Sequence, residues 1–217
     1  MRRIKRTGRG ACHLALVLWA TFVLGGAAHA EAPDALDRLL ASFAQVEGFE
    51  AQFREEKHIA LLVAPLVNEG GVHYARPGMF ARHTRTPERK SLVVRAGKVE
   101  FGTAAKGERV DTAKNPLARQ VVDAYLGLVG GDRKRLEAAF TLSFEGNSDA
   151  EWTLRMVPRD ARLRTVFSGL EFQGVGVRLV RLVVREGGGD WSETTFHGVI
   201  VPRTYGAPER ERIFRLP

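Results

Sequence analysis

The stretch "GGVHYARPGMFARHTRTP", residues 70 to 87, sets the pattern for the rest of the chain. Val72 and Tyr74 alternate with small or polar residues as in a β-strand, and "FARHTRT" alternates again after the chain turns back at "RPGM". Arg76 therefore lies at a chain reversal, where serine or aspartate is the more usual residue. Its guanidinium carries five N–H donors, so the first question is which acceptors this long side chain serves.

The two-residue period extends on both sides of this stretch. Upstream, Phe49, Ala51 and Phe53 alternate with charged or polar residues. Downstream, "SLVVRAGKVEF" predicts a hairpin that turns at Ala96-Gly97. Further strands are expected at residues 140–146 and 151–157 and in a long hairpin over residues 177–201, with glycines 187–189 at its tip.

Helical periodicity appears in two regions. In residues 33–48, Asp34 is a suitable N-cap and Gly48 ends the pattern. The apolar face of this helix consists of Leu36, Leu39, Leu40, Phe43 and Val46. A second helix is expected over residues 115–131, capped by Asn115, and a short third one over residues 132–140. Residues 159–167 fit either a helical turn or a loop.

This order of elements predicts an α+β fold with one strongly curved antiparallel sheet. The helices must bury their apolar faces against that sheet. About three helices of this size do not obviously cover the inward residues of nine or more strands, so an apolar hollow that binds a ligand is expected. A fully packed barrel core has the same periodicity and remains the alternative.

The N-terminus predicts export. "MRRIKRTGRG" carries five basic residues and no acidic one, and a short apolar run and the small residues Ala28 and Ala30 follow. We expect a signal peptide over residues 1–30 and a single domain over residues 31–217. An uncleaved membrane anchor is the alternative, although the apolar run falls short of the roughly 20 residues that span a bilayer.

The export signal changes the meaning of the charge and of the cysteine count. Five of the 33 basic residues lie in the signal, so 28 basic and 25 acidic residues remain, a net charge of +3. This small excess gives little support to nucleic-acid binding, and we expect none. The single cysteine, Cys12, also lies in the signal, which leaves no thiol or disulfide chemistry after cleavage.

Enzymatic motifs are missing from the sequence. It contains no G-x-S-x-G, no P-loop and no H-E-x-x-H, and we expect neither an enzyme nor a cofactor. His73 and His83 could face each other across the "RPGM" reversal and form a two-ligand metal site. Two histidines without a third ligand are more often surface residues, so no metal site is predicted.

Three motifs in order resemble the LolA-like family of periplasmic lipoprotein carriers. They are an F-x-A-x-F strand at residues 49–53, a G-x₅-R-P-x-x-F segment at residues 70–80, and a hairpin that ends in Gly97-Lys98. The ordered match covers residues 34–103, and the second half of the chain is similar in architecture only. The resemblance implies a half-open β-barrel in which the helices form a lid over a hydrophobic cavity.

The resemblance also implies a function and a role for Arg76. Members of the family shield acyl chains and move lipidated cargo through the periplasm, from an inner-membrane donor complex to an outer-membrane acceptor. The arginine before the proline latches the lid in this family by donating to backbone carbonyls of the lid helices, and Arg76 matches it. A solvated Arg76, or one paired with Glu69, is the alternative. We expect a monomer that contacts its donor and acceptor transiently.

The cavity residues are expected on the more apolar side of each strand. They are Phe49, Phe53, Phe80, Leu92, Val94, Phe101, Trp152, Leu154 and Met156. Arg82 shares the face of Phe80, at a position where family members commonly carry an aromatic residue. Because an unpaired guanidinium inside an apolar cavity is costly, we expect Arg82 at the cavity rim, with its head in water, paired with a carboxylate, or bound to an anionic ligand group. The rim position predicts a preference for acylated ligands that carry a phosphate or carboxylate.

Two other functions stay open from the sequence. The same half-barrel serves as a regulatory lipid-sensing module of envelope-stress systems, although such sensors usually add a second domain. A packed structural accessory of an envelope assembly is the third possibility. Neither alternative needs a cofactor.

Overall fold

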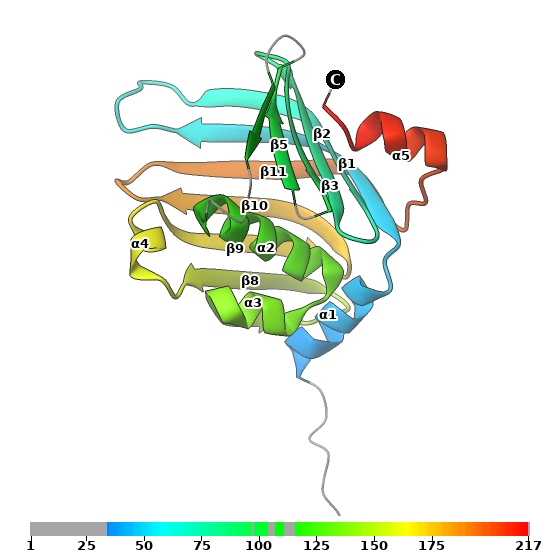
Figure 1. The fold of residues 1–217 in the computed structure, drawn as a ribbon. Helices are drawn as coiled ribbons and strands as arrows, with labels where there is room; N and C mark the ends of the chain where they lie inside the picture. Colours follow the sequence, from blue (N-terminus) through cyan, green and yellow to red (C-terminus); the bar gives the residue numbers. More distant parts are fainter. Residues whose placement is uncertain (1–33, 97, 104–106, 111–115, 217) are drawn as a thin grey trace, which may run out of the picture. The chain divides into compact units, whose positions relative to one another are not determined.

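Eleven strands of the described chain form one antiparallel sheet (Figure 1). The computed structural model describes residues 34–96, 98–103, 107–110 and 116–216. The expected signal peptide, the Asn115 cap and Gly97 of the predicted hairpin turn lie outside these residues. The strands follow the sheet order β6-β5-β4-β3-β2-β1-β11-β10-β9-β8-β7, so that β6 and β7 lie at its two ends and the sheet is open.

The strands of the first half precede the helical segment and those of the second half follow it. The first half consists of β1 (Gly48–His58), β2 (Leu66–Ala75), β3 (Met79–Thr86), β4 (Lys90–Arg95), β5 (Lys98–Gly102) and β6 (Gly107–Val110). The second half consists of β7 (Phe140–Gly146), β8 (Glu151–Pro158), β9 (Phe167–Val175), β10 (Arg178–Glu186) and β11 (Trp191–Ile200). Pairing of β1 with β11 joins the two halves.

In the described part of the chain, five helices accompany the sheet where about three were expected. They are α1 (Ala35–Ala44), α2 (Pro116–Gly130), α3 (Arg133–Ala139), α4 (Ala161–Arg164) and α5 (Ala207–Ile213). Figure 1 shows α1, α2 and α3 together on one face of the sheet. Asp34 caps α1 as predicted, because its side chain accepts a hydrogen bond from the backbone N–H of Asp37 at 2.7 Å. Among the described residues, no helix has the length and hydrophobicity needed to cross a membrane.

One tyrosine shows how strongly the sheet curves. The ring of Tyr125 on α2 lies 4.6 Å from the ring of Phe80 on β3 and 5.7 Å from that of Phe172 on β9. These two strands are five positions apart in the sheet order, which would separate them by about 24 Å in a flat sheet. The sheet therefore bends around α2, so that one side chain reaches both halves.

A glycine permits close packing on the concave face of β2. A Cβ atom at Gly70 would overlap the carbonyl oxygen of His83 and would lie only 2.7 Å from the ring of Phe53. The β2–β3 register also shifts between Glu69 and Gly70, which is the irregularity expected where a strand bends. The glycine of the G-x₅-R-P-x-x-F motif is therefore explained by a tight approach of two strands and one aromatic ring.

The main core lies between the concave face and the helices. On α1, the side chains of Leu36, Leu39, Leu40 and Phe43 are buried. Each such side chain contributes about 1.5–3 kcal/mol when it is fully removed from water. The Phe43 ring meets Trp152 of β8 edge-on at 6.1 Å, so α1 fills the space over the second half of the sheet.

A second, smaller core lies on the other face of β2, β3 and β4. It contains Ala75, Ala81 and Val93 of the sheet and Tyr205, Ile213 and Phe214 of the C-terminal segment, all buried. The Tyr205 hydroxyl donates to the carbonyl oxygen of Phe49 at 2.8 Å. This core is the packing site of α5.

Three elements escaped the sequence analysis, each because its pattern is weak. In β9, Ser168 and Gly169 interrupt the alternation of apolar residues. The four-residue β6 is too short to show a period. The seven residues of α5 form only about two turns and are rich in charge, so its apolar side, where Ile213 is buried, gives a weak pattern. The undecided segment at residues 159–167 contains the short helix α4.

His73 gives the second core a dependence on pH. Its ring lies 3.3 Å from the Tyr205 hydroxyl and 5.9 Å from the His83 ring. Burial lowers the pKa of His73 below its usual 6.5, while the Glu50 carboxylate partly opposes this effect. Glu209 acts in the same direction as Glu50, whereas the charges of His83 and Arg203 lower the pKa further.

We predict that acid weakens this core through His73. Because the pKa is lower in the folded than in the unfolded state, the contribution of neutral His73 is complete above about pH 6.5 and is lost as the pH falls. Between pH 7.5 and pH 5, the melting temperature of the His73→Gln variant should fall by less than that of the parent. His197→Gln, which changes an exposed histidine of β11, should behave like the parent. Equal pH dependence of parent and His73→Gln would contradict the prediction.

Candidate functional site

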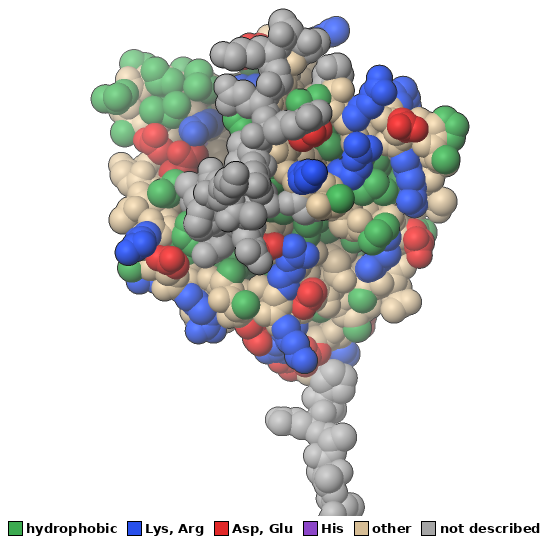
Figure 2. All heavy atoms as spheres, in the orientation of Figure 1, with side chains coloured by type: hydrophobic (Ala, Val, Ile, Leu, Met, Phe, Trp, Pro, Cys, Tyr) green, Lys and Arg blue, Asp and Glu red, His purple; other side chains and the backbone are tan. Residues whose placement is uncertain are grey.

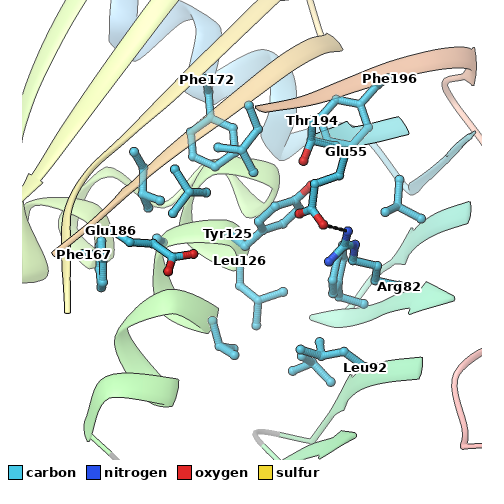
Figure 3. Close-up of a pocket in the computed structure, with 18 of the residues that line it drawn as sticks. Glu55, Arg82, Leu92, Tyr125, Leu126, Phe167, Phe172, Glu186, Thr194 and Phe196 are labelled. Atoms are coloured by element: carbon cyan, nitrogen blue, oxygen red, sulfur yellow. Dashed lines mark ion pairs between the residues drawn. The ribbon is translucent and has the colours of Figure 1, made fainter. Parts of the chain in front are cut away.

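A cavity of about 450 Å³ lies between the two halves of the curved sheet, against α2 (Figure 3). This volume is typical of a site for a small molecule or a lipid chain, which ranges from roughly 300 to 1,000 Å³. Most of its described lining is hydrophobic or aromatic: Val72, Phe80, Leu92, Val94, Val122, Ala124, Tyr125, Leu126, Val166, Phe167, Leu170, Phe172, Leu182, Val184 and Phe196. The remaining lining residues are Glu55, Arg82, Glu186 and Thr194.

Arg82 projects into this cavity and is paired with a carboxylate. Its Nη2 lies 2.9 Å from Oε2 of Glu55, and its guanidinium carbon lies 4.2 Å from the centre of the Phe53 ring. The Arg82 Nη2 atom is buried and forms no aligned hydrogen bond within the described part of the chain, so its contact with Glu55 is an ion pair of imperfect geometry. A cation over an aromatic face is stabilised by the ring quadrupole.

This pairing revises the expected preference for an anionic ligand. The positive charge of Arg82 is offset by Glu55, and Glu186 adds a second carboxylate to the lining. The described lining of the cavity therefore offers no excess of positive charge to a phosphate or carboxylate. Its polar corner fits a neutral group with both donor and acceptor atoms, such as a hydroxyl, an ester or an amide.

Tyr125 lies beside this polar corner (Figure 3). Burial raises the pKa of its phenol well above the ordinary value, although the charge of Arg82 partly counteracts the rise. The hydroxyl is therefore protonated at any physiological pH and can donate a hydrogen bond. Its ring lies between Phe80 and Phe172, so Tyr125 lines the cavity where the two halves of the sheet approach each other.

The cavity reaches the surface near the turn between β10 and β11. Val166, which lines the cavity, is 47% exposed. Glu186 also lines the cavity and forms an ion pair with Lys57 of β1 at 2.7 Å. The backbone N–H of Gly187 donates to the carbonyl oxygen of Val166 at 2.7 Å, which holds these two segments together. We refer to Val166 and Glu186 as the cavity mouth.

Arg76 is bound to the end of α1. Its Nε donates to the carbonyl oxygen of Val46 at 2.8 Å and its Nη2 to that of Phe43 at 3.1 Å. The carbonyl groups in the last turn of a helix lack intrahelical partners, and charge-assisted hydrogen bonds of this kind contribute about 1.5–3 kcal/mol. Glu69, the other partner considered for Arg76, pairs instead with Arg54 at 2.9 Å.

The nine residues expected to line one hollow divide into three groups. Phe80, Leu92 and Val94 line the cavity. Five are buried in the main core: Phe49, Phe53, Trp152, Leu154 and Met156. These five are buried against other side chains instead, with Phe43 of α1 packed on Trp152 and the Arg82 guanidinium over Phe53. The expectation of one hollow over all nine residues was too broad.

Phe101 is the residue whose placement differs most from the expectation. It is 39% exposed and lies on β5, next to the edge strand β6, where it lines a second depression of about 500 Å³ that shares Arg82 and Leu92 with the cavity. Phe101 is not among the described residues that line the cavity beneath α2. Alternation along a strand predicts which face of the sheet a side chain lies on, but it does not predict whether a helix covers that part of the face.

Several cavity residues were missed although the sequence held a signal for some. Glu55 continues the inward alternation of Phe49, Ala51 and Phe53, and Val184 and Phe196 belong to the predicted long hairpin. Extending the two-residue period along these strands would have found them. The α2 residues, by contrast, come to the cavity through the packing angle of the helix, for which the sequence gives no signal.

The two histidines considered for a metal have other partners. His83 donates from Nε2 to the carbonyl oxygen of Ile213 at 2.8 Å, which makes Nδ1 the acceptor for the Ser91 hydroxyl at 2.7 Å. Within residues 34–216, apart from the gaps in the description, no group of three or more potential metal ligands occurs. His73 and His83 fasten the C-terminal segment to the sheet.

Solved structures with a similar chain course come from several bacteria. A LolA superfamily protein from Nitrosomonas europaea is 10% identical, with 84% of this chain and 98% of that chain covered and a TM-score of 0.44. The MucA/MucB complex of Pseudomonas aeruginosa gives 15% identity, coverage of 81% and 58%, and a TM-score of 0.46. The lipoprotein LppX of Mycobacterium tuberculosis gives 7% identity, coverage of 79% and 95%, and a TM-score of 0.42.

A comparison with curated protein sequences found no match. The family model described as "Outer membrane lipoprotein carrier protein LolA-like" matches residues 27–204. That range includes all the described residues that line the cavity and the Arg76 contact with α1. The chain therefore belongs to the LolA-like family.

Proposed function

We propose that the protein is a periplasmic carrier that holds the acyl chain of a lipid or lipidated protein in its cavity and takes it toward the outer membrane. The observation that carries this proposal is the largely apolar cavity of about 450 Å³ beneath α2. Membership in a family described as lipoprotein carriers supports it. The proposal requires no catalysis, no cofactor and no oligomer.

The free energy of hydration explains why such a carrier is needed. Each CH₂ group that leaves water gains about 0.8 kcal/mol, so a chain of about 16 carbons resists exposure by roughly 12 kcal/mol. An aqueous compartment is therefore a barrier unless a protein shields the chain. The carrier must also release the chain, which requires that the helical cover can move.

The contacts of α1 and α2 support the role of the helices as a movable lid. Gly131, directly after α2, packs so closely on α1 that a Cβ atom there would overlap the carbonyl oxygen of Leu40. Arg76 in turn holds the C-terminal end of α1 to the β2–β3 reversal. A change at Arg76 would thus reach α2, which covers the cavity, through α1.

A regulatory lipid sensor is the alternative function. In that case a bound lipid would change the affinity for a membrane partner, and no net transfer of lipid between membranes would occur. Transfer from donor to acceptor vesicles therefore separates the two functions.

The cavity itself is tested by filling it. Val184→Trp places a large side chain at a partly buried position in the cavity lining. It should weaken the binding of a fluorescent fatty-acid analogue at least about tenfold, because the acyl chain then buries fewer CH₂ groups in the cavity. Val180→Trp, on the same strand but 42% exposed, is the matched control and should bind normally. Equal affinity of both variants would place the ligand elsewhere.

The latch is tested at Arg76. In Arg76→Leu the carbonyl groups of Phe43 and Val46 lose the hydrogen bonds donated by the guanidinium. We therefore expect faster hydrogen exchange in α1, retained loading and slower transfer of the ligand to acceptor vesicles. Arg76→Lys, which keeps the charge but not the forked donors, should lie between parent and Arg76→Leu. Arg95→Leu, at an exposed arginine, serves as the control. Unchanged transfer in Arg76→Leu would refute the latch.

The polar corner is tested by removing the charge that neutralises Arg82. In Glu55→Gln the guanidinium keeps its position over Phe53 but loses its counter-charge. We expect this variant to shift preference from a fatty-acid methyl ester toward the free fatty acid, by roughly tenfold, the effect of one charge-assisted hydrogen bond. The double variant Glu55→Gln with Arg82→Gln should lose that shift. A parent that already prefers the free acid would contradict the neutral-ligand proposal.

A further inference from the structure

The turn between β1 and β2 carries the most exposed apolar side chains in the described chain. Leu61 is 93% exposed and Val63 108% exposed, and Leu62 and Leu66 are about half exposed. The eight residues 59–66, "IALLVAPL", contain no polar side chain. Figure 2 shows hydrophobic side chains gathered at the upper left, where Figure 1 places this turn. We call residues 59–66 the apolar tip.

The apolar tip is a defined structure that projects from the sheet. The backbone N–H of Leu62 donates to the carbonyl oxygen of Ile59 at 2.9 Å. The backbone N–H of Ala60 donates to Oδ1 of Asp190 at 3.0 Å, which ties the tip to the neighbouring β10–β11 turn. At its base the rings of His58 and Trp191 stack with their centres 3.9 Å apart. These contacts hold the backbone and leave the aliphatic side chains facing water.

We propose that the apolar tip docks the protein on a lipid bilayer by inserting its side chains into the outer part of the membrane. Contiguous exposed apolar surface of this kind marks an interaction site. All side chains of the tip are aliphatic, and those of Leu61 and Val63 are fully exposed, which suits a fluid hydrocarbon surface. Trp191 at its base has the amphipathic ring that is enriched at membrane–water interfaces.

The charges around the tip specify the kind of membrane surface. Lys57 is paired with Glu186 at 2.7 Å, and Glu56 is paired with Arg54 at 3.0 Å. Asp190 adds a further carboxylate beside Ala60. Exposed Arg185 lies opposite Trp191 in the β10–β11 register, so among the described residues the basic and acidic side chains at the base of the tip are balanced and do not form the basic cluster that recruits proteins to anionic lipids. Insertion is driven by apolar contact, so it should proceed on zwitterionic lipid and depend little on salt.

The tip adjoins the cavity mouth. Lys57, next to the tip on β1, is paired with the mouth residue Glu186. The Asp190 side chain accepts a hydrogen bond from the backbone N–H of Ala60 in the tip, and the Asp190 carbonyl oxygen accepts one from the backbone N–H of Glu186. Docking would thus bring Val166 and Glu186 close to the membrane surface. The consequence for lipid transfer rests on the proposed function, whereas docking itself does not.

The experiment measures flotation of the protein with phosphatidylcholine vesicles, with and without phosphatidylglycerol, at low and high salt. The parent should float with both vesicles at either salt concentration. The tip variant, Leu61→Gln with Val63→Thr, should lose at least about tenfold in partition coefficient, because both changed side chains leave the hydrocarbon. The control variant, Ile200→Gln with Val157→Thr, changes two partly exposed side chains on strands and should float like the parent.

Several outcomes would overturn the proposal. They are flotation of the tip variant at the parent level, absence of parental flotation on protein-free vesicles, and binding that requires anionic lipid. If the parent floats only when the vesicles contain envelope membrane proteins, the tip binds a protein partner instead of lipid. Fluorescent fatty-acid binding in solution should be equal in the tip variant and the parent. If the parent protein floats with vesicles but does not bind the fluorescent fatty acid, the proposed function is refuted and the docking proposal stands.

Discussion

A curved sheet of eleven strands encloses more apolar surface than the helices packed on it can cover, and the cavity follows from this constraint. Helices α1 and α3 fill the concave face toward the β7–β8 end, where Trp152, Leu154 and Met156 are buried. Helix α2 spans the two halves, through Tyr125 between Phe80 and Phe172. Packed interiors avoid large voids because unfilled contacts cost free energy, so a cavity of this size is consistent with a site that a ligand completes.

The polar groups inside the cavity narrow the choice of ligand. A buried ion pair seldom adds stability over apolar packing, because desolvation of both charges offsets their attraction. The Arg82–Glu55 pair is partly buried and imperfectly aligned, so part of this desolvation cost applies to it, while its contact with Phe53 holds the guanidinium at the cavity. Together with the protonated Tyr125 hydroxyl, it gives an otherwise apolar site one corner that can orient a polar group.

The two ends of β1 connect the cavity to the rest of the molecule in different ways. At its beginning, the Phe49 carbonyl accepts from Tyr205, and the reversal after β2 places Arg76 under α1. At its far end, β1 leads through Lys57 to the apolar tip and the cavity mouth. One strand thus joins the segment that fixes the helices to the segment that faces outward. This arrangement would allow events at a membrane surface to reach the mouth first and the helices second.

The sequence by itself determined the strands and helices with strong periods, the cap at Asp34 and the concave side of most strands. Local alternation and capping depend on neighbouring residues only, so they are visible in the chain. It also placed Arg76 at the reversal, although the family resemblance was needed to propose helix carbonyls as its acceptors. Strand β9 lacked that local signal because Ser168 and Gly169 interrupt its alternation. Helix α5 lacked it because charged residues dominate its short sequence.

The tertiary structure alone decided which inward residues line a cavity and which are packed. Phe53 and Phe80 have the same alternation, yet one is in the core beneath Arg82 and the other faces the cavity. The difference arises from the curvature of the sheet and the position of α2, which are set by contacts between residues far apart in the chain. The partner of Arg82 was decided in the same way, because β1 brings Glu55 to it across β2. Distances of this kind result from the whole fold, and no local pattern records them.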